Sequence, residues 1–489
     1  MTQAILAIDQ GTTNSKAVLV SDQGLILARG SAPVGILHPQ PGWVEQEPLR
    51  LWASVQEAIA ACLRAGPDVT IAGIAITNQR ESVTVWDAES GQPLGPVISW
   101  QCRRTAPDCA ALIAEGHAPR VENLTGLPID PMFPGPKMRW LLDRVPTGRT
   151  PRLGTPRLGT IDAWLIHCLT GGATHACDAS NAARSQLYDL RRQCWSAELC
   201  ALFGVPMSCL PEVRDSAAQF GTTRGVSGVP DGIPIAAAIG DSHAALFGQG
   251  AFAPGDGKVT FGTGSSIMAT LPEFIAPRNG ITTTIAWALN GQPTYAFEGT
   301  ILVSASALPW MVDLLGLPDV QALTDLAASA LPDGPGFVPA FVGLGAPRWQ
   351  THARALFSGI TFTTSRAQMA RAVTDSMAFQ VHDIFAVMTA QSPAPLGRLF
   401  ADGGPSQNRF LMQCVADILN HPLIQADAPE ASALGAAYLA GLTLGFWPDL
   451  AAIAALPRSG QRILPQPGDA AQRLRVWKDA IARATLPTA

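Results

Sequence analysis

Short apolar runs, each closed by a small polar turn, open the sequence. Residues 4–8 and 17–20 are apolar, and Gln10-Gly11-Thr12-Thr13 lies between them, which predicts a strand, a tight turn and a second strand. Beyond Pro48, apolar residues recur from Leu49 to Cys62 at spacings of three and four, which predicts an amphipathic helix. Residues 70–77 form a β-branched, apolar run typical of a buried strand. Because strand and helix patterns alternate, we expect an α/β fold.

A second strand–turn–strand pattern occurs in the middle of the chain. An apolar run at residues 233–239 ends in Gly240-Asp241, and a hairpin is expected around Gly262-Thr263-Gly264, between apolar runs at 258–261 and 267–270. Each half of the chain therefore begins with a small polar turn between two strands. We expect two related halves with a hinge near residues 248–257.

Residues 118–162 are rich in proline and glycine. They contain the sequence Thr-Pro-Arg-Leu-Gly twice in succession, at residues 150–154 and 155–159. We interpret this repeat as a short duplication in a surface loop.

Composition excludes several classes of protein. Hydrophobic residues make up 47% of the 489 residues and charged residues 15%, which argues against a disordered chain. The net charge of −5 carries no basic stripe, so we expect neither a nucleic-acid partner nor an anionic membrane. The longest apolar stretch, residues 433–447, is interrupted by three glycines and is too short to span a bilayer.

The targeting signals and cysteines indicate a cytoplasmic protein. The N-terminus has no basic segment ahead of an apolar run, as a signal peptide would require. Nine scattered cysteines form no C-x-x-C pair, which is typical of reduced intracellular thiols. The sequence also contains no G-x-x-x-x-G-K-[ST], G-x-G-x-x-G or H-E-x-x-H motif, so a nucleotide or metal must be held by other groups.

Three turns offer backbone N–H groups to an anion. In the first, Asp9 precedes Gly11-Thr12-Thr13, and a carboxylate at the end of a strand can hold Mg²⁺. The second is Gly262-Thr263-Gly264. In the third, Asp402-Gly403-Gly404 precedes a helix and would place two glycines at its N-terminus. Each is compatible with an ordinary turn, and their occurrence together favours phosphate binding.

Charged residues also lie where strands end. Asp241 follows an apolar strand, the position at which α/β folds present groups to a ligand. One of Asp9 and Asp241 can bind a metal while the other acts as a base. Arg80-Glu81 and Trp100 offer donors, acceptors and an indole face to a polyhydroxylated ligand, with a surface salt bridge as the alternative. For His243 a buried structural role is favoured, because no Ser or Cys nucleophile pattern accompanies it.

With these residues in place, the sequence resembles the FGGY family of carbohydrate kinases, within the actin-like ATPase superfamily, and among them the glycerol kinases. The resemblance rests on motifs in the same order along the chain, at residues 5–13, 42–45, 76–81, 159–165, 339–347, 402–404 and 433–441. It implies two ribonuclease-H-like domains around a central catalytic cleft. Residues 1–248 would bind the polyol or sugar and residues 249–489 the nucleotide.

The resemblance further implies ATP-dependent, Mg²⁺-assisted phosphorylation of a hydroxyl on a small polyol or sugar, in a homodimer or homotetramer. Asp241 would be the general base and Asp9 the Mg²⁺ ligand. The nucleotide-side positions are Thr12, Thr13, Asn14, Gly262, Thr263, Ala305, Gly404 and Asn408. The substrate-side positions are Arg80, Glu81, Trp100, Met132, Asp241, Ser242 and Ser266.

Several of these positions depart from the glycerol-kinase pattern. Met132 stands in place of a tyrosine, Ser242 of a glutamine and Ser266 of an aromatic residue, while Ala305 and Pro309 replace a glycine and a glutamine on the nucleotide side. An aromatic wall exchanged for Met and Ser enlarges the pocket. A four- or five-carbon polyol or ketose of the erythritol, xylulose or ribulose type is therefore an alternative substrate to glycerol.

Two further classes and one regulatory site are less favoured. An actin-like or chaperone ATPase has no need of the set Arg80, Glu81, Trp100 and Asp241. A kinase-like sensor without turnover does not need Asp9, Asp241 and both turns intact. Residues 224–231 contain a single basic residue, Arg224, which gives little support for a regulatory sugar-bisphosphate site.

Overall fold

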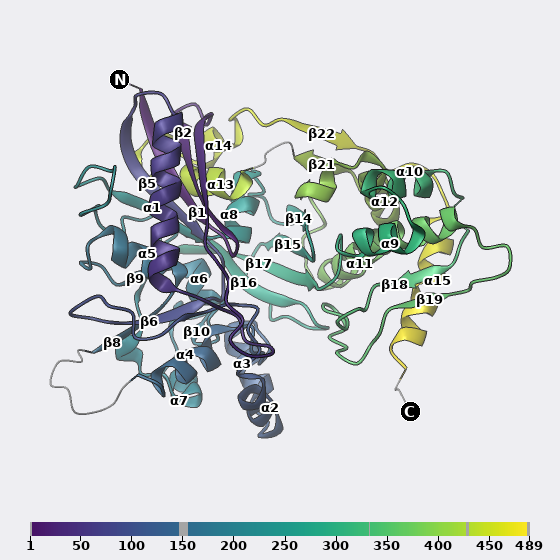
Figure 1. Ribbon diagram of the computed structural model, residues 1–489, viewed down its shortest axis with the longest axis horizontal. Coiled ribbons are helices and arrows are strands. Elements are labelled where there is room, and N and C mark those ends of the chain that lie inside the picture. The colour runs from purple at the N-terminus through teal and green to yellow at the C-terminus, as the bar shows by residue number, and fades with distance from the viewer. Residues whose placement is uncertain (1, 146–154, 332, 427–429, 487–489) are drawn as a thin grey trace. The chain divides into compact units, whose positions relative to one another are not determined.

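The computed structural model describes residues 2–145, 155–331, 333–426 and 430–486 (Figure 1). The chain forms two compact units. Unit 1 comprises residues 1–250, 283–295 and 430–457, and unit 2 comprises residues 251–282, 296–429 and 458–489.

The main sheet of unit 1 has the strand order β13-β5-β1-β2-β3. Its strands are β1 (Gln3–Gln10), β2 (Asn14–Ser21), β3 (Ile26–Pro33), β5 (Thr70–Asn78) and β13 (Ile235–Gly240). Strand β5 runs parallel to both β1 and β13, whereas β1, β2 and β3 pair antiparallel. The predicted opening hairpin and the two later buried strands are confirmed.

Helix α1 (Pro48–Ala65) begins at the predicted proline and packs on β2 and β3. Its buried face contains Leu51, Val55, Ile59 and Cys62, whereas Leu49, which the spacing placed on the apolar face, is 48% exposed. The helix approaches the sheet closely at Gly30, where a Cβ would lie 2.2 Å from a backbone oxygen of the helix. A side chain at this position would push the helix off the sheet.

A second, four-stranded sheet in unit 1 has the order β4-β7-β6-β8. Its strands are β4 (Glu45–Gln46), β7 (Val97–Ile98), β6 (Val83–Asp87) and β8 (Pro156–Thr160). Strand β8 contains most of the second Thr-Pro-Arg-Leu-Gly copy, so the predicted surface loop is wrong there. The physical reason is that Leu158 is fully buried in the core and Gly159 leaves room for the ring of Trp86. The first copy lies outside the described residues.

The remaining elements of unit 1 surround these two sheets. Its helices are α2 (Ala106–Ala114), α3 (Ala118–Thr125), α4 (Pro134–Leu142), α5 (Ile161–Leu169), α6 (Ala179–Ala183), α7 (Ala197–Phe203), α8 (Asp241–Gly248), α13 (Ala431–Leu444) and α14 (Leu450–Ala454), with a 3₁₀ turn at Met207–Cys209. Two short strand pairs are β9 (Ala176–Asp178) with β12 (Glu212–Arg214) and β10 (Tyr188–Asp189) with β11 (Cys194–Trp195).

Helix α13 belongs to unit 1 although it lies near the end of the sequence. It packs on β1, β5 and β13 and against α8, where a Cβ on Gly435 would lie 1.8 Å from the carbonyl oxygen of Ala244. We expected one boundary near residue 248, but residues 430–457 lie beyond that boundary and still pack with unit 1. The division of function between residues 1–248 and 249–489, and the hinge near 248–257, stay predictions.

A seven-stranded sheet with the order β16-β17-β15-β14-β20-β21-β22 supplies the main strands of unit 2, except that residues 283–295, which cover most of β16 and the start of β17, belong to unit 1. Its strands are β14 (Gly257–Phe261), β15 (Ser265–Leu271), β16 (Thr282–Leu289), β17 (Gln292–Ile301), β20 (Leu399–Asp402), β21 (Leu423–Ala426) and β22 (Gly460–Ile463). The hairpin β14–β15 is antiparallel, and β14 pairs parallel with β20. The hairpin β1–β2 and its parallel neighbour β5 have the same arrangement, as expected for two related halves.

The helices of unit 2 are α9 (Ala307–Leu315), α10 (Val320–Ala328), α11 (Arg366–Gln391), α12 (Arg409–Leu419) and α15 (Ala470–Ala484), with a strand pair β18 (Gly336–Val338) and β19 (Leu356–Ser358). Helix α11 has 26 residues and begins with a capping box between Ser365 and Gln368. Within the described ranges, no helix has both the length and the apolarity needed to cross a membrane.

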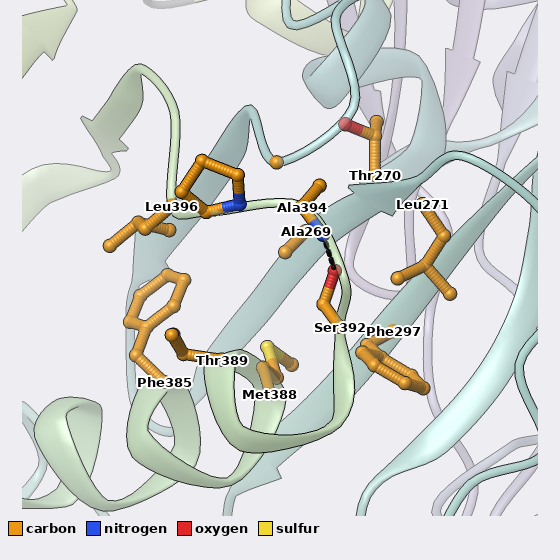
Figure 2. A pocket seen from close by; sticks show the side chains of 12 residues that line it. Ala269, Thr270, Leu271, Phe297, Phe385, Met388, Thr389, Ser392, Ala394 and Leu396 are labelled. Carbon is orange, nitrogen blue, oxygen red and sulfur yellow. Dashed lines mark hydrogen bonds between the residues drawn. The ribbon is translucent and has the colours of Figure 1, made fainter.

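A small apolar pocket lies along the seam where α11 packs on the sheet. Figure 2 shows Phe385 and Met388 of α11 near Ala269 and Leu271 of β15 and Phe297 of β17. Its volume is about 10 Å³, which is the space of roughly one water molecule. We therefore interpret it as a packing gap.

Candidate functional site

Two aspartates meet at one edge of the main sheet in unit 1. Asp9 is the second-last residue of β1, and Asp241 follows the last residue of β13. Strand β5 lies between them, with Thr77 opposite Asp9 and Asn78 opposite Gly240. Because these three strands are parallel, their carboxyl ends share one edge, where α/β folds bind ligands.

Asp9 is held in an environment that disfavours its negative charge. Burial, with a smaller contribution from the charge of Asp241, raises the pKa of the Asp9 carboxyl to about 7, while the ammonium of Lys16 acts in the opposite direction. Lys16 lies opposite Asp9 on β2, and its Nζ is 3.0 Å from an oxygen of Glu430. An additional cation near Asp9 would favour the ionised carboxylate.

Contacts with Arg80 and Ser242 orient Asp241, and its side chain is partly exposed. Its Oδ1 lies 3.3 Å from Nε of Arg80 and accepts a hydrogen bond from the backbone N–H of Ser242 at 2.6 Å. The Asp241 side chain is 38% exposed, against 12% for Arg80. Gly240 makes this pairing possible, because a Cβ there would lie 2.7 and 2.8 Å from Cγ and Cδ of Arg80.

Glu81 is buried and held by two contacts. Its φ of 59° is in the left-handed region that non-glycine residues rarely adopt. Its Oε1 lies 2.6 Å from Nε of Arg184, and its backbone oxygen accepts a hydrogen bond from Nζ of Lys137 at 3.1 Å. The alternative of a surface salt bridge does not apply to Glu81, because its side chain is 6% exposed.

Lys137 joins two of the predicted substrate-side positions. Besides Glu81, its Nζ donates to the backbone oxygen of Met132 at 2.5 Å, and Met132 donates its own N–H to Asp130 at 2.8 Å. Burial lowers the pKa of Lys137 to about 7. Sequence reasoning missed Lys137 and Arg184, since neither stands in a recognisable motif.

The first polar turn contacts the indole of Trp100. Nε1 of Trp100 donates to Oγ1 of Thr12 at 2.9 Å, and the N–H of Gly11 donates to the carbonyl oxygen of Asn14 at 3.0 Å. Thr13 and Asn14 are exposed. The structure therefore brings the predicted phosphate turn and a predicted substrate residue together.

His243 lies inside unit 1. It is fully buried, and its Nε2 is 3.4 Å from Oγ1 of Thr284. This is the structural placement expected for a buried histidine.

The second polar turn folds against the start of α9 in unit 2. The N–H of Ala305 donates to the carbonyl oxygen of Gly262 at 3.0 Å, and Oγ of Ser306 donates to that of Thr263 at 2.9 Å. Ser266 lies on β15, where its Oγ donates to Glu298 at 3.3 Å. Gly262, Thr263 and Ala305 therefore form one local cluster.

A cavity of about 450 Å³ lies beside this cluster in unit 2. This volume is in the usual range for small-molecule pockets. The cavity is lined by Ala305, Leu308, Pro309, Val320, Gln321, Thr324, Gly404, Pro405, Gln407, Asn408 and Leu411. Three predicted nucleotide-side residues, Ala305, Gly404 and Asn408, thus share one pocket.

The turn after β20 differs from the prediction. Gly403 and Gly404 do not begin the long helix; they precede and open a 3₁₀ turn, Gly404–Gln407, and α12 begins at Arg409. The reason is the side chain of Asn408, which caps α12 by accepting the N–H of Leu411 at 3.0 Å. Asn408 also donates to Oγ1 of Thr324 at 2.9 Å, and a Cβ on Gly404 would meet no atom within 4 Å.

Comparison with known proteins identifies the family. The N-terminal domain model of the FGGY family of carbohydrate kinases matches residues 4–248, and the C-terminal domain model matches residues 257–444. An apulose kinase of Pectobacterium atrosepticum is 45% identical, with 99% of each chain covered, and a glycerol kinase of Symbiobacterium thermophilum is 44% identical, with 98% of each covered.

A solved structure of a glycerol kinase has a closely similar fold. The crystal structure of Plasmodium falciparum glycerol kinase with ADP has a TM-score of 0.92 and 31% identity, covering 100% of this chain and 99% of that one. The predicted α/β fold with ribonuclease-H-like, actin-like ATPase domains is confirmed. The chain therefore belongs to the FGGY family of carbohydrate kinases and is an ATP-dependent sugar or polyol kinase.

Proposed function

We propose that this kinase transfers the γ-phosphoryl group of ATP to a terminal hydroxyl of a small polyol or ketose, with Asp241 as the general base. The observation that supports this is the placement of Asp241 at the end of β13, paired with Arg80 and close enough to Asp9 to affect its pKa. Glycerol and a four- or five-carbon polyol or ketose are the two candidate substrates.

In this proposal the acceptor oxygen attacks the γ-phosphorus as its proton passes to the Asp241 carboxylate. The new bond joins that oxygen to phosphorus, and the bond between the γ-phosphorus and the bridging oxygen breaks, which leaves ADP. Arg80 keeps Asp241 oriented through the contact between its Nε and Oδ1 of Asp241. The Asp241 side chain is 38% exposed, which gives the hydroxyl access to it.

Asp9 fits a role as the Mg²⁺ ligand. No cluster of three or more His, Cys, Asp or Glu suited to a metal occurs in the part of the chain that is described. Mg²⁺ does not require one, because it is commonly bound through one or two carboxylates, waters and substrate phosphates. Asp9 is such a carboxylate, with the negative charge of Asp241 nearby. When bound, the ion would neutralise charge on the phosphate oxygens.

For the acceptor, we propose contacts with Arg80, Glu81 and Trp100, which combine charged groups with an indole that is 36% exposed. Relatives named glycerol kinase and apulose kinase match this chain at 44% and 45% identity, so identity alone favours neither substrate. Met132 and Ser266, in place of aromatic residues, support the longer acceptor.

For the nucleotide, we propose that the adenosine part of ATP occupies the 450 Å³ cavity of unit 2. Gly404 offers open space to a flat ring, and Asn408 offers an amide at the cavity wall. The turn Gly262-Thr263-Gly264 would then contact the phosphates with its backbone N–H groups.

The test is the substitution Asp241→Asn, which keeps the shape of the side chain and removes its basicity. We expect kcat to fall by about 10²–10⁴, the usual contribution of a positioned acid–base group. The fold and ADP affinity should stay unchanged, as measured by circular dichroism and calorimetry. Turnover at the wild-type rate would remove Asp241 from the mechanism.

A further inference from the structure

A closed ring of hydrogen bonds lies beneath the first polar turn of unit 1. At its centre lie three buried glutamines, Gln10, Gln46 and Gln79, each of which is no more than 1% exposed. We call these three residues the glutamine network. They come from β1, from β4 and from the segment after β5, so they are distant in the sequence.

Gln79 is the hub of the network. Its Nε2 donates to Oε1 of Gln10 at 3.0 Å and to Oε1 of Gln46 at 2.9 Å. Its Oε1 accepts the hydroxyl of Ser82 at 2.9 Å. Each of these contacts uses the amide, so a side chain of the same size without the amide would lose all three.

The outer bonds of the network reach the polar turn. Nε2 of Gln46 donates to the carbonyl oxygen of Thr12 at 2.6 Å, and Nε2 of Gln10 donates to that of Gly11 at 2.7 Å. The backbone N–H of Gln79 also donates to the carbonyl oxygen of Gln10 at 2.7 Å. The turn is therefore fixed from below through its own backbone.

The ring closes through Trp100. Ser82 accepts the backbone N–H of Trp100 at 3.1 Å, and Nε1 of Trp100 donates to Oγ1 of Thr12 at 2.9 Å. A path of hydrogen bonds thus runs from Thr12 through Gln46, Gln79, Ser82 and Trp100 and back to Thr12. Buried polar networks whose members are hydrogen-bonded hold one arrangement rigidly, because breaking a bond leaves a polar group without a partner.

We propose that Gln79 is a positioning residue that fixes the Thr12 turn relative to the acceptor-binding residues Arg80 and Trp100. Arg80 is the next residue in the chain, so the amide that holds the turn also holds the segment that carries Arg80. This inference rests on the proposed function, in which the turn contacts phosphate and Arg80 and Trp100 contact the acceptor. Misplacing reacting groups by about 1 Å can lower a rate about 10²-fold.

The variant Gln79→Met removes the amide and keeps the length of the side chain. We expect kcat with the preferred acceptor to fall about 10- to 100-fold, while the affinity for ADP and the KM for the acceptor change less than threefold. Gln186→Met is the matched control: Gln186 is also a buried glutamine of unit 1, and its amide donates to the carbonyl oxygen of Pro128. The kcat of the Gln186→Met enzyme should stay within twofold of the wild-type value.

A double-variant cycle separates positioning from a general loss of stability. Trp100→Phe removes the indole donor to Thr12, so we expect a kcat loss of its own. Because both residues act through one ring, Gln79→Met/Trp100→Phe should lose little more than the more severe single variant. Additive losses, or a folded Gln79→Met or Trp100→Phe enzyme with wild-type kcat, would overturn the proposal.

Amide hydrogen exchange tests the same inference without turnover. In Gln79→Met, the amides of residues 11–14 should exchange at least tenfold faster than in wild type, and in Gln186→Met they should not. Unchanged exchange in Gln79→Met overturns the positioning role even if the enzyme is active. Faster exchange in a protein that phosphorylates no polyol or ketose would support the network and contradict the proposed function.

Discussion

At the scale of single residues, the absence of one methyl group shapes the candidate site. Gly240 ends β13 directly before Asp241, and the stem of Arg80 lies across it, where a Cβ would be 2.7 Å from Cγ. The backbone of Gly240, with φ of −63° and ψ of 146°, is open to any residue. The constraint at this position is therefore steric and comes from Arg80.

Gly240→Ala should displace Arg80 from Asp241. We expect the KM for the acceptor to rise about tenfold, by analogy with the loss of a hydrogen bond to a charged group, and kcat to fall as well. Steady-state kinetics measure both. Gly468→Ala is the control, because a Cβ at Gly468 would meet no atom within 4 Å. Unchanged kinetics in folded Gly240→Ala would show that Arg80 does not need its present position.

The site residues that the sequence predicted stand in short motifs at the ends of strands. Asp9, Arg80, Glu81 and Asp241 were found in this way, and β1, β5 and β13 bring them to one edge of the sheet. The roles assigned to them stay predictions. Sequence reasoning placed Gln10 and Gln79 in motifs, but it missed Lys137, Arg184 and the contacts within the glutamine network, because these depend on how distant segments pack.

At the scale of elements, periodicity predicted the strands and α1, but it did not predict local turn chemistry. The turn after β20 forms a 3₁₀ segment because Asn408, rather than a glycine, caps α12. Strand β8 was missed because its sequence, with proline and glycine, is typical of a loop. Proline is tolerated there because it is the first residue of an edge strand.

Asn408 has two separable roles at this element. Asn408→Ala should lower the free energy of unfolding by about 1 kcal/mol, the typical cost of a lost N-cap. Asn408→Asp should restore that stability, since aspartate is an equally good cap, but it cannot donate to Thr324. We expect ADP affinity to fall in both variants, as measured by calorimetry.

Asp449→Ala is the matched control for that experiment. Asp449 caps α14 of unit 1 by accepting the N–H of Ala452 at 2.8 Å. Its loss should lower stability by a similar amount and leave ADP affinity unchanged. If Asn408→Asp binds ADP like wild type, the Asn408 amide has no part in nucleotide binding.

At the scale of the whole molecule, both units repeat a hairpin paired with a parallel strand, and each hairpin carries a small polar turn. The sequence predicted this repetition. It did not predict that residues 430–457 belong to unit 1, because the packing of α13 against α8 depends on Gly248 and Gly435 meeting across a long sequence distance. Substrate choice depends on a few side chains, and similarity over the full chain does not determine it.

The most direct test of the central claim is an assay of ADP release over polyols and ketoses of three to six carbons, including glycerol and apulose. We predict that ADP forms only when an acceptor is added, and that a four- or five-carbon acceptor has a higher kcat/KM than glycerol. A preference for glycerol over every longer acceptor would refute the enlarged pocket alone. ADP release at the same rate with and without every acceptor would contradict the account of this protein as a polyol or sugar kinase.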